Sequence, residues 1–303
     1  MSSQPVTKGQ RVESGQEVAR GQRVINRRQQ ASVILKYTVL IVLTIIILFP
    51  FFWMIATSLK TNSEALTNPT ALFPAVPQWH NYPDVIQALD YWRETLNSLI
   101  MSLGVTLGQI FLAALAGYAF ARLPFFGRDV LFLITLATLI IPFEILFVPL
   151  YLMMSTWGGW LNTFAALIVP SLASPFAIFV FRQFFLTIPK ELDEAAKMDG
   201  AGYYRIFWTI MLPLSGPAIA TVFILTFLAE WSNLLKPLVF TSSPELYTLQ
   251  QGLTINLSRG ANLVPNVATL MAGVVLASIV PVIMFLLGQK YFVRSVASSG
   301  LKG

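Results

Sequence analysis

The sequence predicts an all-α integral membrane protein with six transmembrane helices, and three observations indicate this class. First, 55% of the 303 residues are hydrophobic and only 11% are charged, whereas soluble domains carry roughly 25% charged residues. Second, six long segments contain almost no charge. Third, lysine and arginine are distributed unevenly among the connections between these segments. Much of the surface is therefore expected to face lipid.

A helix needs about 20 mostly apolar residues to cross the hydrocarbon core of a bilayer, and six segments provide this length. Four of them are free of charged residues, and the other two contain one carboxylate each, Glu144 and Glu230. The predicted spans are residues 37–59, 95–121, 130–155, 163–181, 216–235 and 261–289.

The orientation follows from the positive charges, because lysine and arginine accumulate in cytoplasmic connections. The N-terminal segment, the second connection, the fourth connection and the C-terminal segment hold seven, two, four and three of the 20 lysines and arginines. The connections on the opposite side hold only four. Both termini and the fourth connection are therefore expected in the cytoplasm, and the chain is expected to be a multi-pass membrane protein.

The N-terminal segment differs from the rest of the chain. Residues 1–32 are polar and basic, and they contain three short repeats that are too polar to build a core. They are expected to form a disordered basic cytoplasmic tail attracted to anionic lipid, and residues 33–303 the transmembrane domain. The net charge of +6, distributed in this way, favours the lipid bilayer over nucleic acid as a partner.

The fourth connection, residues 187–216, carries a spaced motif. Glu194-Ala195-Ala196 is followed after three residues by Gly200, and after nine more by Ile210-x-Leu212-Pro213. Pro189 suits the first turn of a helix and Gly200 its C-terminal stop, since glycine adopts a left-handed backbone that other residues resist. Two short helices that meet at Gly200 are therefore predicted, the second ending before Pro213.

This motif resembles the cytoplasmic coupling loop of permease subunits of ATP-driven importers. From about Tyr37 onward the chain is similar to binding-protein-dependent ABC importer permeases for carbohydrate uptake, in particular the smaller maltose-type permease. The resemblance implies the type I ABC importer permease fold and a location in the cytoplasmic (inner) membrane of a prokaryote. Further matching segments are Ser58-Leu59-Lys60, Asn97-Ser98, Gly117 to Arg122, Gly127-Arg128 and Trp231-x-Asn233.

The resemblance also implies partners: a second permease subunit, two copies of a cytoplasmic ATPase and an extracytoplasmic solute-binding protein. The chain has no phosphate-binding loop, so ATP and magnesium would be bound by the ATPase, and this chain would be no enzyme and hold no cofactor. The positions implied for ATPase coupling are Glu194, Ala195, Ala196, Asp199, Gly200, Ile210, Leu212 and Pro213. The end of the chain, Gly300-Leu301-Lys302-Gly303, resembles a tail that reaches between the two ATPases.

Glu144 and Glu230 lie inside predicted spans, where ionisable groups are costly unless they face protein or a water-filled path. Both lie 13–14 residues into their spans, which indicates a similar depth. We hypothesise that these two carboxylates, Trp231 and Asn233 border a translocation path, with the tryptophan stacking on a sugar. The alternative is that the carboxylates hold helices together.

The predicted function is therefore the import of a sugar or polyol, and other functions stay open. A glycerol phosphoester or a peptide is an alternative solute, because specificity in such systems rests largely on the binding protein. A proton-coupled secondary transporter could use Glu144 or Glu230 as a relay. A membrane-embedded enzyme is disfavoured, since the chain has one histidine and no cysteine, and His80 alone cannot make a metal site.

Overall fold

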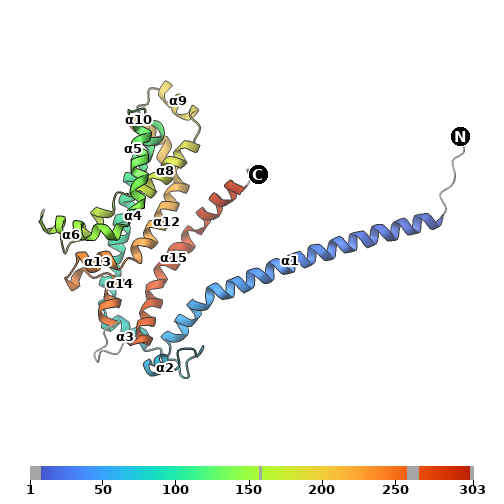
Figure 1. The fold of residues 1–303 in the computed structure, drawn as a ribbon, viewed down its shortest axis with the longest axis horizontal. Coiled ribbons are helices and arrows are strands. Elements are labelled where there is room, and N and C mark those ends of the chain that lie inside the picture. Colours follow the sequence, from blue (N-terminus) through green and yellow to red (C-terminus); the bar gives the residue numbers. More distant parts are fainter. Residues whose placement is uncertain (1–7, 157–158, 258–265, 301–303) are drawn as a thin grey trace. The chain divides into compact units, whose positions relative to one another are not determined.

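The computed structural model describes residues 8–156, 159–257 and 266–300 (Figure 1). Every regular element in these ranges is a helix, which confirms the all-α class. The chain divides into two compact units, residues 1–56 and 57–303, and each is described by itself.

The first unit consists of helix α1 (Lys8–Ser58), whose last two residues belong to the second unit. Its segment Ser32–Ser58 is long and apolar enough to cross a membrane. The helix begins at Lys8, within the segment 1–32 that the sequence predicts to be a disordered tail; the disorder of this tail stays a prediction. The tail is rich in glutamine and arginine, which are good helix formers.

Four long helices form the centre of the second unit. They are α4 (Tyr91–Arg122), α8 (Pro175–Thr187), α12 (Gly216–Trp231) and α15 (Val267–Gly300). Helix α4 packs against α8 and α12, and α12 packs against α15. The three contacts make α4 and α12 the middle of the bundle.

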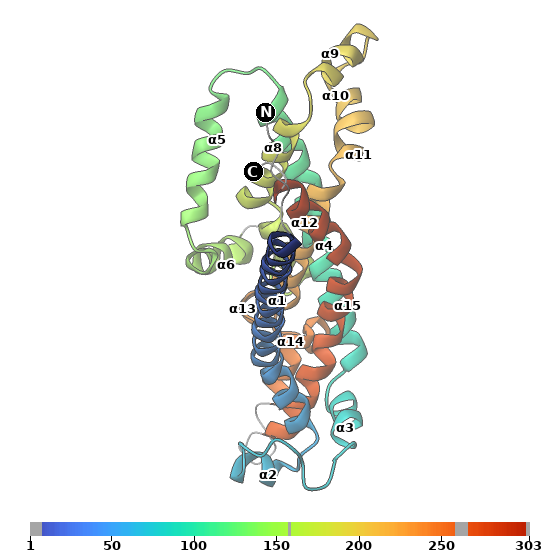
Figure 2. The same ribbon diagram turned by 90° about the vertical axis from the view of Figure 1, so that its right-hand side faces the viewer.

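Shorter helices lie at the two ends of this bundle. Helices α9 (Glu191–Met198) and α10 (Tyr203–Ile206) lie at one end, and α2 (Asn62–Thr67) and α3 (Asn81–Ala88) lie at the other (Figures 1 and 2). The remaining elements are α5 (Arg128–Ala137), η1 (Thr138–Ile140), η2 (Phe143–Leu146), α6 (Phe147–Thr156), α7 (Phe164–Ile168), η3 (Val169–Ser171), η4 (Phe207–Met211), α11 (Leu212–Leu214), α13 (Leu235–Phe240), η5 (Pro244–Leu246), α14 (Leu249–Gly252) and η6 (Leu253–Leu257).

Two of the predicted spans, 130–155 and 163–181, are bent in the structure, and a third bend directly precedes the span 216–235. Two helices of the second unit, α4 and the part of α15 up to Gly288, are long and apolar enough to cross a membrane, while three helix pairs reach this length only across a break. The breaks bend the chain by 89° between Ile140 and Phe143, by 45° between Ser171 and Pro175, and by 71° between Leu214 and Gly216. Residues 130–155, predicted as one span, therefore form a broken helix pair that still has the length and apolar character of a span. Pro142 explains the sharpest break, because proline removes a backbone donor and disfavours the helical conformation of the residue before it.

The backbones of α4 and α8 approach closely at Gly117. A Cβ atom at this position would lie 2.7 Å from Cβ of Phe181 and 2.9 Å from the backbone nitrogen of Arg182, so only glycine fits without a shift of one helix. A cluster of buried side chains surrounds the crossing, and it includes Tyr118, Phe181, Phe185, Ile206, Phe207 and Met211. The crossing thus fixes the end of the bundle that carries α9.

We expect Gly117→Ala to lower the free energy of unfolding by about 1–3 kcal/mol, since an added methyl group in a packed site forces neighbouring atoms apart. Thermal unfolding of the purified protein in mild detergent measures this change. Gly216→Ala is the matched control, because no atom outside its local backbone lies within 4 Å of a Cβ there. Equal melting temperatures for the two variants would show that α4 and α8 can move apart at Gly117 without loss of stability.

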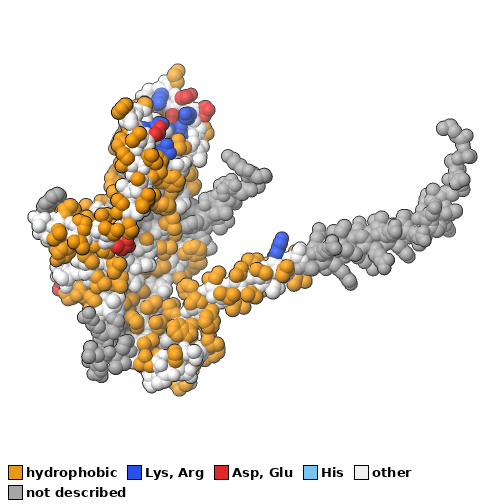
Figure 3. All heavy atoms as spheres, viewed as in Figure 1, with side chains coloured by type: hydrophobic (Ala, Val, Ile, Leu, Met, Phe, Trp, Pro, Cys, Tyr) orange, Lys and Arg blue, Asp and Glu red, His pale blue; other side chains and the backbone are white. Residues whose placement is uncertain are grey.

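The surface of the second unit separates apolar from charged side chains. Hydrophobic side chains cover most of the face seen in Figure 3, and lysine, arginine, aspartate and glutamate gather at the end that carries α9. Helix α5 is an example of the apolar part, since Val130, Leu133 and Ile134 are each more than half exposed. This separation is typical of a chain whose sides face lipid or another apolar protein surface and whose ends face water.

Candidate functional site

Helix α9 ends in a left-handed turn at Gly200, whose φ is +80°. The Gly200 N–H donates to the carbonyl of Lys197 and the Ala201 N–H donates to the carbonyl of Ala196, both at 2.9 Å. This pair of hydrogen bonds is a Schellman motif, which satisfies the last carbonyls of a helix and requires a left-handed residue. The sequence predicts both the stop and the left-handed conformation at Gly200, and the structure has both.

The outer surface of α9 is formed by several of the predicted coupling residues. Glu194, Ala195 and Asp199 are exposed, and Ala196 is half-buried against the core. Met198, the last residue of the helix, is 89% exposed. An exposed apolar methionine beside two carboxylates and a small alanine gives this helix a surface that another protein can cover. Whether an ATPase covers it stays a prediction at this point.

The second half of the predicted motif lies in the helix that follows. Ile210 and Leu212 are partly buried against the core, whereas Pro213 is exposed. The predicted end of this helix before Pro213 is wrong, since helical structure continues to Leu214. The π-helical turn η4 directly precedes this segment. A π-helical turn shifts the backbone hydrogen bonds by one residue. The helix can therefore accommodate Pro213, which has no backbone N–H to donate.

The guanidinium of Arg122 joins three helices beneath α9. It donates to the carbonyl of Phe185 at 2.6 Å and to the carbonyl of Ile188, and its Nη1 lies 3.3 Å from Oδ2 of Asp193. The side chains of Arg122 and Asp193 are only 5% and 11% exposed. One buried charge thus connects the end of α4, the end of α8 and the first turn of α9. We call this arrangement the arginine clamp.

Asp193 is not among the residues that the sequence singled out. The motif drew attention to its neighbour Glu194, and nothing in the spacing links Asp193 to an arginine 71 positions earlier. Burial raises the pKa of the Asp193 carboxyl above its ordinary value, while the charges of Arg122 and Lys197 act in the opposite direction. Arg122 therefore favours the charged form of this carboxyl, which burial disfavours.

A second candidate site is a pocket of about 300 Å³ in the middle of the unit. Glu144, Glu230 and Asn233, three of the four residues assigned to a translocation path, line the same pocket. Glu144 reaches it from η2, after the break at Pro142, and not from a straight helix as the depth argument assumed. The other lining residues are Gln109, Phe143, Pro170, Ser171, Ala173, Ser174 and Pro175.

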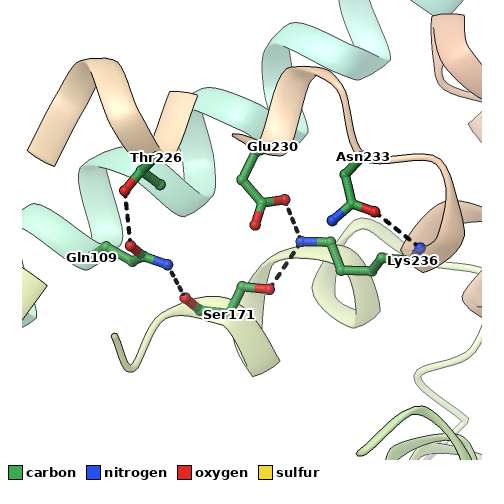
Figure 4. A network of polar contacts seen from close by, with 6 residues as sticks. All are labelled: Gln109, Ser171, Thr226, Glu230, Asn233 and Lys236. Carbon is green, nitrogen blue, oxygen red and sulfur yellow. Dashed lines mark hydrogen bonds and ion pairs between the residues drawn. The ribbon is translucent and has the colours of Figure 1, made fainter. Parts of the chain in front are cut away.

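Polar contacts connect several residues of the pocket wall to Thr226 and Lys236 in one network (Figure 4). Nζ of Lys236 lies 2.5 Å from Oε2 of Glu230 and donates to Oγ of Ser171 at 2.9 Å. Gln109 donates to the carbonyl of Ser171 at 2.6 Å and accepts from the Thr226 hydroxyl at 3.0 Å. Glu230 thus has a buried counter-charge and links α12 to α13, which agrees with the alternative that this carboxylate holds helices together.

The sequence did not single out Lys236, which was counted as a residue of an external connection. Its side chain is fully buried. Its backbone N–H donates to Oδ1 of Asn233 at 3.1 Å, so the turn after α12 points both Asn233 and Lys236 toward the network. A signal was available in retrospect: the intramembrane Glu230 needs a partner, and Lys236 is the nearest cation along the chain.

Trp231 is directed away from the pocket. Its side chain is 2% exposed, its indole Nε1 donates to the carbonyl of Ala277 at 3.1 Å, and its ring stacks on Phe227 at 6.0 Å. Successive residues of a helix point about 100° apart, so Glu230 and Trp231 cannot both face the pocket. The hypothesis that this tryptophan stacks on a sugar is therefore not supported by the structure.

The proposed tail contact lies mostly outside the described residues. Gly300 is the last residue of α15, and Leu301, Lys302 and Gly303 lie beyond the described ranges. No cluster of three or more histidine, aspartate or glutamate side chains able to hold a metal occurs where the structure describes the chain.

Comparison with known proteins gives the family. The model for the binding-protein-dependent transport system inner membrane component matches residues 109–298. The arabinooligosaccharides transport system permease protein AraQ of Halalkalibacterium halodurans is 37% identical over 261 residues, which cover 85% of this chain and 92% of the relative. The sn-glycerol-3-phosphate transport system permease protein UgpE of Yersinia pestis is 33% identical over 270 residues, 87% of this chain and 95% of the relative.

A solved structure supports the fold. A chain from the crystal structure of a bacterial ABC transporter involved in the import of the acidic polysaccharide alginate superposes with a TM-score of 0.73 at 20% identity. The superposition covers 96% of this chain and 100% of that one. The protein therefore belongs to the family of inner membrane components of binding-protein-dependent transport systems, as a permease of a bacterial inner membrane with the fold of an ABC importer permease.

Proposed function

We propose that the chain is one of two permease subunits of an ATP-driven importer that carries a sugar or polyol into the cell. The observation that carries this proposal is the 37% identity to an arabinooligosaccharide permease over most of both chains. A glycerol phosphoester is the second candidate solute, because a glycerol-3-phosphate permease is 33% identical. The permease itself is not an enzyme, and ATP and magnesium would bind to the partner ATPase.

The proposed topology has six spans, with each bent helix pair counted as one, and both termini in the cytoplasm. Two observations support it. Sixteen of the 20 lysines and arginines belong to the predicted cytoplasmic segments. In addition, the ion pair between Arg122 and Asp193 brings the second and fourth connections to the same end of the bundle, as this topology requires.

The proposed partners are a second permease, two cytoplasmic ATPases and an external solute-binding protein. The exposed surface of α9, with Leu192, Ala195 and Met198, fits a groove on an ATPase. The exposed apolar side chains of α5 and α6, for example Leu133, Ile134 and Val148, fit lipid and the second permease. ATP-driven movement of α9 would then reach the bundle through Arg122.

Affinity purification of the tagged chain in mild detergent tests this assembly. We expect an ATPase and a second permease to be retained and identified by mass spectrometry. A chain that elutes alone from membranes that contain both subunits would contradict the proposal.

The orientation has its own test, because the chain contains no cysteine. A single cysteine in the variant Glu194→Cys is expected to react with a membrane-impermeant maleimide only after the cells are opened. A cysteine at the exposed Trp79 is expected to react in intact cells and serves as the control. Reaction of the Glu194→Cys thiol in intact cells would reverse the proposed topology.

A proton-coupled transporter is distinguished by its energy source. Uptake should persist when an uncoupler collapses the proton gradient while the ATP concentration is maintained. Loss of uptake under this condition would favour the rival function.

Glu144→Gln is expected to lower uptake about threefold to tenfold, because a carboxylate on the pocket wall binds solute hydroxyls more strongly than an amide does. Glu230→Gln is expected to lower uptake further, since it leaves Lys236 buried without its counter-charge. Uptake of labelled solute measures both effects. Glu245→Gln, the same change at an exposed position outside the pocket, is the control. Unchanged uptake in both pocket variants would remove this pocket from the path.

A further inference from the structure

We propose that the pocket lined by Glu144, Glu230 and Asn233 is a charge filter, which admits uncharged solutes and repels anionic ones such as phosphoesters. This inference rests on the proposed function, because it assigns the pocket to the solute path. It also decides between the two candidate solute classes, a sugar and a glycerol phosphoester.

The first step is the net charge of the pocket wall. Glu230 is neutralised by Lys236 at 2.5 Å. Glu144 is exposed to the pocket, and no hydrogen bond or ion pair to its carboxylate is found among the described residues. The lining residues include no lysine or arginine. The wall therefore carries one uncompensated negative charge.

The second step is that the described residues at the pocket offer no free cation to an anionic solute. The ammonium group of Lys236 contacts two residues of the wall, Glu230 and Ser171, but its side chain is fully buried and occupied by these two partners. A phosphate monoester carries about −1.5 to −2 charge at neutral pH. Next to Glu144 this charge is repelled, and in a partly dehydrated pocket the repulsion is stronger than in water.

The third step is that the remaining groups suit hydroxyls. The Asn233 amide is oriented by its Oδ1, which accepts from the Lys236 N–H. Its amide nitrogen can therefore donate to a solute, while Glu144 can only accept. Hydroxyl groups both donate and accept, so a polyol can satisfy both side chains. A volume of about 300 Å³ lies at the lower limit of ligand pockets and suits a solute that passes one ring at a time.

The test uses the absence of native cysteine. Ala173 is exposed and lines the pocket, so Ala173→Cys places a unique thiol beside Glu144. The purified importer complex is treated with a cationic and an anionic methanethiosulfonate reagent of similar size. Ser155→Cys, an exposed position outside the pocket, supplies the reference ratio of the two rates and corrects for the intrinsic reactivity of the reagents.

At low salt we expect the cationic-to-anionic rate ratio at Ala173→Cys to exceed the reference about tenfold, because one charge acts with opposite sign on the two reagents. Adding Glu144→Gln should return the ratio to the reference value. The double change Glu230→Gln with Lys236→Met removes the ion pair but no net charge, and should leave the ratio raised.

A ratio equal to the reference with Glu144 present, or a raised ratio that survives Glu144→Gln, would overturn the charge filter. These results are distinct from a failure of the proposed function. The latter would appear as loss of the partner ATPase on purification or as uptake that follows the proton gradient, whereas the thiol reactivity is measured without transport.

Discussion

Replacing Gly200 with valine is expected to abolish uptake while the chain still inserts into the membrane. The φ of Gly200 is +80°, and a β-branched residue is a genuine outlier in this region. The left-handed conformation costs other residues about 1–2 kcal/mol, enough to unwind the last turn of α9 or to redirect it. The surface formed by Glu194 and Ala195 would then no longer meet the ATPase. ATP-dependent uptake, compared with the amount of chain in the membrane, measures the effect.

Gly200→Asn separates the bend from the size of the side chain. Asparagine tolerates the left-handed conformation, and no atom lies within 4 Å of a Cβ at this position, so most uptake should remain. Equal loss of uptake in the asparagine and valine variants would show that any side chain here blocks docking, and that the bend is not the cause. Normal uptake in the valine variant would remove Gly200 from the coupling mechanism.

The parts of the molecule that the sequence predicts well are those set by local chemistry. The length and apolar character of the spans follow from the thickness of a bilayer, and the stop of α9 at Gly200 follows from the backbone freedom of glycine. The short helix around Glu194 belongs to the same class, since the residues that set it are close together in the chain. Each of these signals can be read within a window of one or two helical turns.

The features that sequence reasoning missed depend on the angle between consecutive helices or on contacts between residues that are far apart in the chain. Hydropathy detects that residues 130–155 can span a membrane, but it does not give the 89° bend after Ile140, because a proline permits a break without fixing its angle. Glu144 therefore reaches the pocket from η2, after the break, and not from a straight helix. The burial of Lys236 and the interior position of Trp231 depend on how α12, α13 and α15 pack, which one sequence does not reveal.

Arg122→Met is expected to uncouple the ATPase from the bundle and to lower uptake at least tenfold. The change leaves Asp193 buried without its counter-charge, and removing one partner of a buried ion pair costs about 3–5 kcal/mol. The carbonyls of Phe185 and Ile188 also lose their donor. Helix α9 would then be free to move without carrying α4 and α8 with it. Uptake and ATP hydrolysis by the purified complex, measured in parallel, should show that hydrolysis persists or rises while uptake falls.

Two further variants identify the cause. Arg128→Met is the matched control: this arginine pairs with its neighbour Asp129 at the exposed start of α5, where such pairs contribute about 0–1 kcal/mol, so uptake should stay normal. Arg122→Lys keeps the charge near Asp193 but lacks the planar group that reaches two carbonyls and a carboxylate together. If coupling depends on the whole arginine clamp, the Arg122→Lys variant should retain more uptake than Arg122→Met but less than the unchanged protein. Full uptake in the lysine variant would show that the ion pair with Asp193 is sufficient for coupling and that the two carbonyl contacts are not needed. Full uptake in the methionine variant would show that Arg122 is not needed, and that α9 is coupled to the bundle by its packing.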